Sequence, residues 1–343
     1  LYSSLAVATP DTPSSTAFAL RHYIRILAPE SMHPYTEAMV QAFMGRRQGQ
    51  PPVIETRPTR AATTLFCAGV GAAHPDVLVI PRRLSHAEYN RCIEQGVEQI
   101  AEVVFGYEVL ALAVKREVIP FPLTAEQIYL ALAAEVPKDG GFQANTTRTW
   151  HDVDARLPEQ EIQVVIPTRK AGARDLFNNE VLEAGCRGLS EIRKIYSATE
   201  RTAKCLGLRS DGPLVERPPY ALQSHLFQAP AGTIGVMPLH QVEMAGRSLL
   251  TLPFEGVLPT RPSIETGSYP LSRRLYLYVK LGHIQERKGY GVTEGLREFL
   301  REASGEQALE PGGIFDRLGL ILPPPAERVR QRLDGLLLRP MVR

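Results

Sequence analysis

LFCAGVGAAHPDVLVIPRR, residues Leu65–Arg83, has the clearest structural pattern in this sequence. Its apolar run Val77–Ile80 is unbroken, and Pro81 followed by two arginines ends it abruptly. Strands covered on both faces of a parallel sheet have such unbroken Val, Ile and Leu runs. Glycines before the run and a proline after it are typical of loops. The pattern favours a buried strand that delivers a loop to a cleft; an ordinary strand and turn is the alternative.

Further runs of strand length lie on both sides of this stretch, with helical patterns between many of them. Two predicted helices open with a capping box, formed by Ser85 with Glu88 and by Thr124 with Gln127. Strands are expected at residues 23–27, 52–56, 77–80, 100–105, 109–114, 162–166, 233–237 and 275–279, and helices at 35–44, 85–96, 124–134, 174–184 and 293–303. Strands that alternate with helices predict an α/β fold with mostly parallel sheets flanked by helices.

The composition is that of a globular protein large enough for two domains. The chain has 343 residues, of which 44% are hydrophobic and 22% charged, and its formal net charge is +2. Because no long basic run accompanies that charge, nucleic acid is not an expected partner. No apolar run approaches the roughly 20 residues that span a bilayer. Residues 1–21 are rich in Ser, Thr, Ala and Pro; we expect a tail or linker there and recognise no signal peptide.

The four cysteines form two pairs that are local in sequence, Cys67 with Cys92 and Cys186 with Cys205. Neither pair has the short C-x-x-C spacing of zinc and redox sites. Two local disulfides are therefore expected, each stabilising by roughly 3 kcal/mol, and they imply an oxidising compartment. Four separate buried thiols in a cytosolic protein are the alternative.

The sequence shows no arrangement of residues that is typical of an enzyme. It contains no P-loop, no metal-ligand spacing and no recognisable nucleophile–base pair, so we expect neither catalysis nor a cofactor. An isolated histidine is more often a surface or core residue than a functional one. The scattered histidines include His33, His74, His151, His225, His240 and His283.

Many motifs in one order make the chain resemble the periplasmic phosphate-binding proteins that serve as receptors of Pst-type ABC importers. The resemblance covers about residues 22–332. It rests on LFCAGVG (65–71), PD followed by RR (75–83), FGYE (105–108), LTAEQIYLALAAEVP (123–137), RTW (148–150), AGARDLF (171–177), GC (185–186), RSDG (209–212), GSYPLSRRLYLYVK (267–280) and GLREFL to GLILPPPAERVRQR (295–332). All four cysteines stand where the family has cysteines, which implies the disulfides Cys67–Cys92 and Cys186–Cys205 and a periplasmic location.

The resemblance implies the two-lobe fold of type II periplasmic binding proteins, with two crossing strands and a ligand cleft between the lobes. It places the crossings near Gly106–Glu108 and Gly235–Met237, where glycines suit a hinge. The implied units are a tail at 1–21, lobe one at 22–107 plus 237–332, lobe two at 108–236, and a C-terminal tail at 333–343. One disulfide then belongs to each lobe.

The resemblance also implies the residues of the ligand cleft, although every phosphate loop departs from the family pattern. By family position the cleft contains Glu30, Ser31, Met32, Thr59, Arg60, Arg82, Ala171, Gly172, Ala173 and Arg174. The family's Gly-Ser-Ser-Thr loop reads Ala28-Pro29-Glu30-Ser31 here, and its Thr-Gly-Thr-Gly-Gly-Gly loop reads Arg57-Pro58-Thr59-Arg60-Ala61-Ala62. Pro81 replaces a serine, and Ser-Gly-Thr-Arg-Asp has become Ala171-Gly172-Ala173-Arg174-Asp175. Backbone N–H groups and hydroxyls that would hold an oxyanion are thereby lost.

These losses predict weak binding of phosphate. A charge-assisted hydrogen bond is worth ~1.5–3 kcal/mol, so losing several removes roughly 5 kcal/mol or more. We expect a dissociation constant above ~10 μM, and a fold repurposed as a scaffold or accessory subunit docking to an envelope or membrane complex. The alternative is a working importer receptor for phosphate or another oxyanion, with Arg60, Arg82, Arg174 and Lys170 as the binding groups.

Two segments outside the cleft favour the scaffold. Ile284–Thr293 is longer and more polar than the family's connection at this place. Leu333–Arg343, LDGLLLRPMVR, has three adjacent leucines flanked by charged residues. Such leucines, if exposed, mark a contact with a protein partner or a membrane surface. The alternative is a segment that folds back on its own lobe.

Glu30 brings a carboxylate into a loop that normally binds an anion. A carboxylate only accepts hydrogen bonds and a guanidinium only donates them, so each satisfies the other when both are buried. We therefore hypothesise that Glu30 acts as a built-in anion, paired with Arg82 or else with Arg60 or Arg174. The alternative is that Glu30 points to solvent from a turn.

Overall fold

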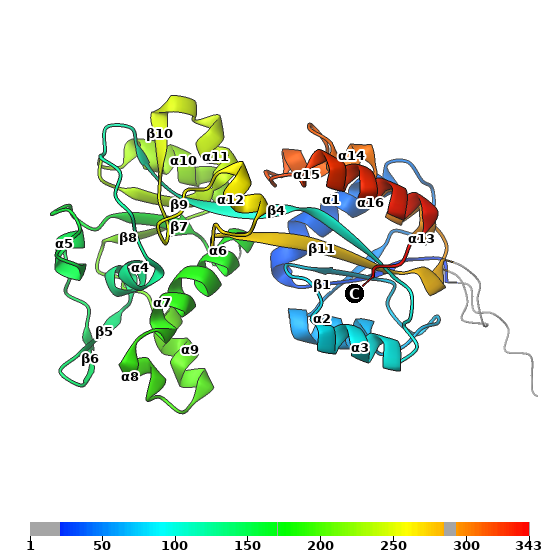
Figure 1. Cartoon of the computed structure of the whole chain (residues 1–343), viewed down its shortest axis with the longest axis horizontal. Coiled ribbons are helices and arrows are strands. Elements are labelled where there is room, and N and C mark those ends of the chain that lie inside the picture. Colours follow the sequence, from blue (N-terminus) through cyan, green and yellow to red (C-terminus); the bar gives the residue numbers. More distant parts are fainter. Residues whose placement is uncertain (1–20, 170, 285–292, 343) are drawn as a thin grey trace, which may run out of the picture.

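The computed structural model describes residues 21–169, 171–284 and 293–342, which form two lobes joined by two long strands (Figure 1). The first of these strands, β4 (Ile100–Lys115), begins in lobe one and ends in lobe two. The second, β11 (Ser272–Lys280), runs back beside it in the antiparallel direction. The expected two lobes with two crossing strands are therefore present.

Lobe one is built on strands in the order β2-β1-β3-β11-β4. The further strands are β1 (Arg25–Ala28), β2 (Val53–Thr56) and β3 (Val77–Ile80). β1 pairs in parallel with β2 and β3, whereas β11 is antiparallel to β3 and β4. All four residues of β3 are buried, which confirms the buried strand predicted from its unbroken apolar run.

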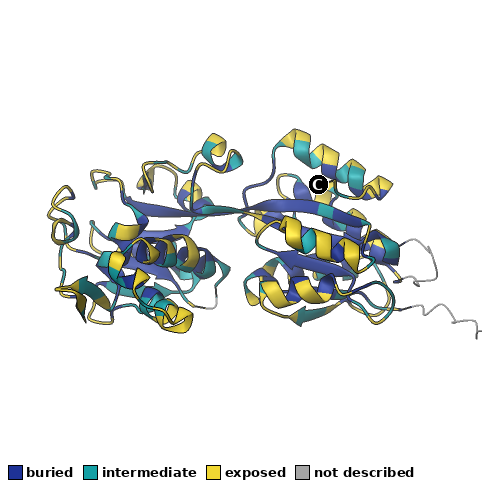
Figure 2. Ribbon diagram, turned by 60° about the horizontal axis from the view of Figure 1, so that its bottom comes forward, coloured by how far each residue is buried: buried dark blue, intermediate teal, exposed yellow. Residues whose placement is uncertain are grey.

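Helices cover both faces of the sheet in lobe one (Figure 1). The helices are η1 (Glu30–Met32), α1 (His33–Met44), α2 (Thr59–Phe66), α3 (His86–Glu94), η4 (Leu281–His283), α13 (Leu296–Ala303), α14 (Glu306–Leu309), α15 (Ile314–Arg317) and α16 (Pro325–Leu337). Val77 and Val79 pack in the core beneath α1 and α13, while Leu78 and Ile80 pack in the core beneath α2 and α3. Figure 2 shows the strands as mostly buried and the helices with exposed outer faces.

Lobe two continues the same sheet, which is mixed rather than mostly parallel. Its strands are β7 (Val164–Pro167), β8 (Leu214–Arg217), β9 (Ile234–Pro238) and β10 (Leu249–Leu252), with a separate hairpin of β5 (Glu135–Lys138) and β6 (Gly141–Ala144). β7 is parallel to β8 and β9, whereas β9 and β10 are antiparallel to β4. The parallel pairs thus lie away from the crossing strands, in both lobes.

Helices and helical turns of lobe two surround this half of the sheet. They are α4 (Ala125–Leu132), α5 (Trp150–Val153), α6 (Gly172–Phe177), η2 (Asn178–Glu183), α7 (Ala184–Arg187), α8 (Ser190–Arg193), α9 (Ala198–Leu206), α10 (Pro219–Gln228), α11 (Leu239–Met244), η3 (Gly246–Ser248) and α12 (Arg261–Glu265). α6, η2 and α7 follow one another without a break, as one helical stretch from Gly172 to Arg187. No described helix meets the length and hydropathy expected of a membrane span.

The return crossing differs from the sequence expectation. The sequence places residues 237–271 in lobe one, but in the structure Leu239, Phe254 and Tyr269 belong to the same core as Val165 of β7. The return strand is β11, in which Ser272 lies opposite Val109. The expected crossing at Gly235–Met237 is therefore wrong, and the chain returns near Ser272–Arg274.

Glycines in the crossing region leave room for neighbouring side chains. A Cβ on Gly235 would lie 2.5 Å from Met237 Cε, so this glycine accommodates a neighbouring side chain inside lobe two. A Cβ on Gly106 would lie 2.8 Å from Leu320 Cδ1. Beside Gly106 the register of β4 against β11 shifts by one residue, a bulge that bends the strand between the lobes.

Several local predictions are confirmed. Ser85 with Glu88 and Thr124 with Gln127 form complete capping boxes at α3 and α4. The disulfide Cys67–Cys92 joins the end of α2 to α3, with 4.2 Å between the Cα atoms. Cys186–Cys205 joins α7 to α9 in lobe two, with 5.3 Å between the Cα atoms. Each lobe therefore has one disulfide.

The C-terminal segment is not a separate tail. Residues 333–337 are the last turns of α16, and the Met341 N–H donates to the Ile100 carbonyl at 2.7 Å. The Gln331 side chain accepts a hydrogen bond from the Val104 N–H of β4. The segment therefore folds back on lobe one. Of the polar insertion Ile284–Thr293, residues 285–292 lie outside the described part of the chain.

Candidate functional site

A cavity of about 340 Å³ lies between the lobes, where helical segments from both begin. It is lined by Pro29, Glu30, Ser31, Pro58, Thr59, Arg169, Ala171 and Asp175. Pro29, Pro58 and Ala171 are the residues directly before η1, α2 and α6. Three helical segments thus present their N-terminal ends to one cavity, which we call the cleft.

Sheet topology explains why these ends meet. β1, β2 and β7 each end just before the corresponding helical segment, and ligands of open α/β sheets bind at the carboxyl ends of strands. The first N–H groups of a helix have no partner within the helix and carry a partial positive charge. The cleft therefore has the electrostatic character of an anion site.

Side chains add few donors to this arrangement. Ser31 and Thr59, both partly buried, are the hydroxyl-bearing residues among those that line the cleft. Arg169 is 78% exposed, and its guanidinium lies 3.9 Å from the Glu216 carboxylate. Such an exposed contact is weak, so the Arg169 guanidinium is available to a ligand. Lys170, which follows it, lies outside the described residues.

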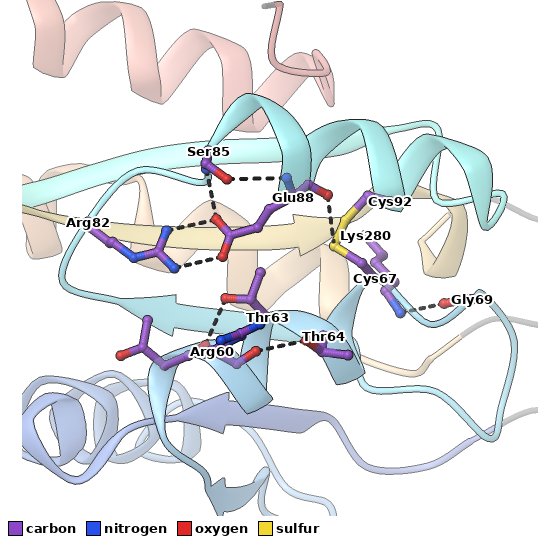
Figure 3. Close-up of a disulfide and its surroundings, with 11 residues drawn as sticks. Arg60, Thr63, Thr64, Cys67, Gly69, Arg82, Ser85, Glu88, Cys92 and Lys280 are labelled. Atoms are coloured by element: carbon purple, nitrogen blue, oxygen red, sulfur yellow. Dashed lines mark hydrogen bonds and ion pairs between the residues drawn. A yellow bond between two sulfur atoms is a disulfide. The ribbon is translucent and has the colours of Figure 1, made fainter. Parts of the chain in front are cut away.

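The hypothesis that Glu30 is a built-in anion is wrong. Glu30 is exposed, and it makes no ion pair or side-chain hydrogen bond with any residue that the structure describes. Arg82 instead forms two 2.7 Å hydrogen bonds to the Glu88 carboxylate (Figure 3). The Arg82 guanidinium thereby holds the pKa of Glu88 at about 2. Arg82 is not among the residues that line the cleft.

Arg174 also has partners other than Glu30. Its side chain is buried and donates to the Pro167 carbonyl at 2.8 Å and to Asn178 Oδ1 at 2.9 Å. Its guanidinium lies 3.1 Å from Glu216, and burial lowers the pKa of Arg174. Arg60 is exposed on α2 and does not line the cleft. Neither arginine thus has the position that the oxyanion-receptor alternative required.

Of the remaining residues expected in the cleft, two are buried in the cores of the lobes and one lies where the lobes meet. Met32 is buried in the core of lobe one and Ala173 in the core of lobe two. Gly172 faces the opposite lobe: a Cβ there would lie 2.8 Å from the Ser31 carbonyl oxygen and 3.2 Å from Glu108 Oε1. This glycine therefore lets η1 and α6 approach each other across the cleft.

An arginine that sequence reasoning missed ties the lobes together beside the cleft. Arg273 of β11 donates to Glu108 of β4 at 2.7 Å and to Asp175 of α6 at 2.7 Å. It also reaches the Gly172 carbonyl at 3.3 Å. Tyr35 Oη lies 3.4 Å from Glu108 Oε1, and burial raises the pKa of Tyr35. The sequence did contain a signal for this residue. Adjacent side chains of a strand point to opposite faces of the sheet, so the neighbouring arginines Arg273 and Arg274 of β11 cannot both point the same way.

A larger hollow of about 870 Å³ lies on the outside of lobe one, among α1, α13, α14, α15 and α16. Arginines and glutamates of both signs line it, including Arg46, Arg301, Glu302 and Glu306. It is remote from the carboxyl ends of the strands, so the smaller cleft is the better candidate for a solute site. No group of three or more His, Cys, Asp or Glu in the described chain is placed to hold a metal ion.

Comparison with known proteins agrees with this architecture. Residues 8–306 match the model of the PBP superfamily domain. The protein SphX of Synechocystis sp. is 25% identical over 292 residues, which cover 84% of this chain and 75% of SphX. The phosphate-binding protein PstS of Staphylococcus saprophyticus is 23% identical over 170 residues, covering 49% of this chain and 45% of that protein. The match thus spans less than half of that PstS.

Solved structures show the same fold. A possible phosphate-binding protein from Planctomyces limnophilus superposes with a TM-score of 0.67 at 17% identity, covering 93% of this chain and 100% of that one. PstS from Borrelia burgdorferi gives a TM-score of 0.55 at 16% identity, covering 89% and 100%. At such identities the likeness establishes the fold. The chain therefore belongs to the PBP superfamily, with SphX and PstS among its homologues and phosphate-binding proteins among its structural neighbours.

Proposed function

We propose that this protein is an extracytoplasmic solute receptor, not an enzyme, and that it binds a small oxyanion in the cleft for an ABC importer. The observation that carries the proposal is the convergence of three helical N-terminal ends on a cavity that Arg169 also lines. Kinship with the phosphate-binding protein PstS supports a receptor. The two disulfides support an oxidising location such as the periplasm.

Phosphate itself is a weak ligand in this proposal. Pro29 and Pro58 have no N–H to donate, and Ala171 has no hydroxyl. Arg82 and Arg174 are engaged by Glu88 and by groups of lobe two. With several charge-assisted bonds missing, each worth ~1.5–3 kcal/mol, the dissociation constant for phosphate lies above ~10 μM.

Isothermal titration calorimetry at neutral pH with phosphate, sulfate and small phosphonates tests the proposal. We expect at least one of these oxyanions to bind, and Arg169→Ala to weaken that binding about tenfold or more. Arg297→Ala, an exposed change on α13 of lobe one, is the matched control and leaves affinity unchanged. Failure of every oxyanion to bind would contradict the receptor. Sub-micromolar phosphate binding would contradict the predicted weakness.

A scaffold that docks to an envelope partner is the second candidate, and one observation favours it. Val329, Leu333, Leu336 and Leu337 are 44–58% exposed, although α16 is packed on lobe one. Their spacing places them on one face of the helix. A stoichiometric envelope complex that Leu333→Asp abolishes would support the scaffold. Met244→Asp, at an exposed apolar residue of lobe two, is the control.

A further inference from the structure

The charged side chains around the cleft are of both signs. Among the described residues that line it, Arg169 is the cation, whereas Glu30 and Asp175 are carboxylates. The Asp175 carboxylate is already paired with Arg273 at 2.7 Å. Glu30 has no such partner in the described chain. A carboxylate without a described partner thus lines a cavity whose helical ends attract anions.

This arrangement discriminates between classes of ligand. A plain oxyanion that sits against the helical ends gains from Arg169 but is repelled by Glu30. A plain cation gains from Glu30 but is repelled by Arg169 and by the helical ends. A ligand with both charges satisfies all of these groups at once, provided that its charges are separated by a short linker.

We infer that the cleft selects a small zwitterion, an oxyanion that also carries a positively charged amino group. The oxyanion lies against the N-terminal ends of α2 and of the helical stretch that begins at Gly172, with Arg169 beside it. The ammonium group faces Glu30. This inference rests on the proposed function, because it names the substrate class of the same cleft.

The size of the cleft agrees with a ligand larger than phosphate. The cavity measures about 340 Å³. Inorganic phosphate has five non-hydrogen atoms and needs on the order of 100 Å³, judged from the ~30 Å³ that one water occupies in the liquid. Room therefore remains for a short amino-bearing chain. Ser31 and Thr59, which also line the cleft, are further partners for the oxyanion.

A matched pair of ligands tests the inference directly. Ethylphosphonate and 2-aminoethylphosphonate have the same phosphonate group and nearly the same size, and only the second carries an ammonium group. In calorimetry at pH 7 we expect 2-aminoethylphosphonate to bind about tenfold or more tightly than ethylphosphonate, as one charge-assisted contact predicts. Glu30→Gln removes the charge at nearly constant shape and should reduce this preference to less than about threefold.

Glu37→Gln is the control variant, because Glu37 is exposed on α1 and does not line the cleft. It should leave the preference unchanged, and circular dichroism shows whether each variant is folded. Equal binding of the two phosphonates would overturn the inference while leaving the receptor intact. A preference that survives Glu30→Gln would also overturn it. If neither phosphonate, phosphate nor sulfate binds, the proposed receptor function itself fails.

Discussion

The cleft and the interior of lobe one both contain charged side chains, but the two regions differ in how far these side chains are buried and paired. In lobe one, Asp76 is fully buried and accepts hydrogen bonds from His283 at 2.7 Å, from Thr293 at 2.8 Å and from the backbone N–H of Arg25 at 2.7 Å. Arg21 also donates to Asp76. In the cleft, Glu30 is exposed and has no such partner among the described residues, and Arg169 is exposed with only a 3.9 Å contact to Glu216.

We call Arg21, Asp76, Lys280, His283 and Thr293 the Asp76 cluster; all five are buried. The Lys280 ammonium donates to the Gly69 carbonyl at 2.6 Å, and His283 Nε2 accepts from the Gly71 N–H at 2.8 Å. The Asp76 cluster therefore links three distant parts of the chain. Burial makes internal partners obligatory because an unpaired buried charge is costly, whereas solvent lets an exposed side chain such as Glu30 remain available to a ligand.

Removing the central carboxylate should produce the largest effect. Asp76→Asn keeps the shape of the side chain but leaves Arg21 without its buried counter-ion. We expect the free energy of unfolding to fall by about 3–5 kcal/mol, as measured by urea denaturation. A loss below about 1 kcal/mol would show that the buried charges do not depend on one another, and the contrast with the cleft would disappear.

The buried lysine of the Asp76 cluster predicts a pH dependence. Burial lowers the pKa of Lys280 to about 7, whereas the unfolded chain keeps this proton up to a pKa of about 10.4. Below pH 7 both states are protonated and the cost of burying the charge is fully present. Between pH 7 and about 10 the unfolded state binds more protons, so this group makes stability rise with pH, by up to about 4 kcal/mol.

Urea denaturation of the protein and of Lys280→Met between pH 6.5 and 9.5 isolates this contribution. Met has a similar length and no charge, so the rise of stability with pH should be smaller in the variant. Identical pH profiles for the two proteins would mean that Lys280 titrates normally despite its burial.

The disulfide of lobe two tests a part of the molecule outside both regions. Replacing Cys186 and Cys205 by serine opens a loop with a sequence separation of 19. We expect a loss of about 3 kcal/mol in the free energy of unfolding and no change in oxyanion affinity. A change in affinity without unfolding would mean that the bridge also positions the helical stretch that ends at Arg187.

Glu30→Gln should have the smallest effect on stability. Because Glu30 is exposed and has no described partner, we expect the free energy of unfolding to change by less than about 0.5 kcal/mol. The same substitution is expected to change ligand preference. A stability loss near that of Asp76→Asn would contradict the view that this carboxylate is free.

Much of the local structure was determined by the sequence itself. The capping boxes at Ser85 and Thr124, the buried strand Val77–Ile80 and the two disulfides all involve residues that are close along the chain. Such features depend on side-chain type and spacing, both of which can be read directly. Family position also brought Glu30 and Thr59 to the candidate cleft, where both line the cavity.

Tertiary structure alone decided the return crossing and the partners of the arginines. Gly235 is a residue type that suits a hinge, but Met237 and Leu226 pack against it within lobe two. The ion pair between Arg273 and Glu108 joins residues 165 positions apart, and nothing local distinguishes it from other pairings. Arg82 pairs with Glu88 because the loop into α3 brings their side chains together, and Glu30 has no ion pair with any described residue. Long-range partners depend on the path of the backbone through space, since guanidinium groups pair with any carboxylate that the fold places within reach.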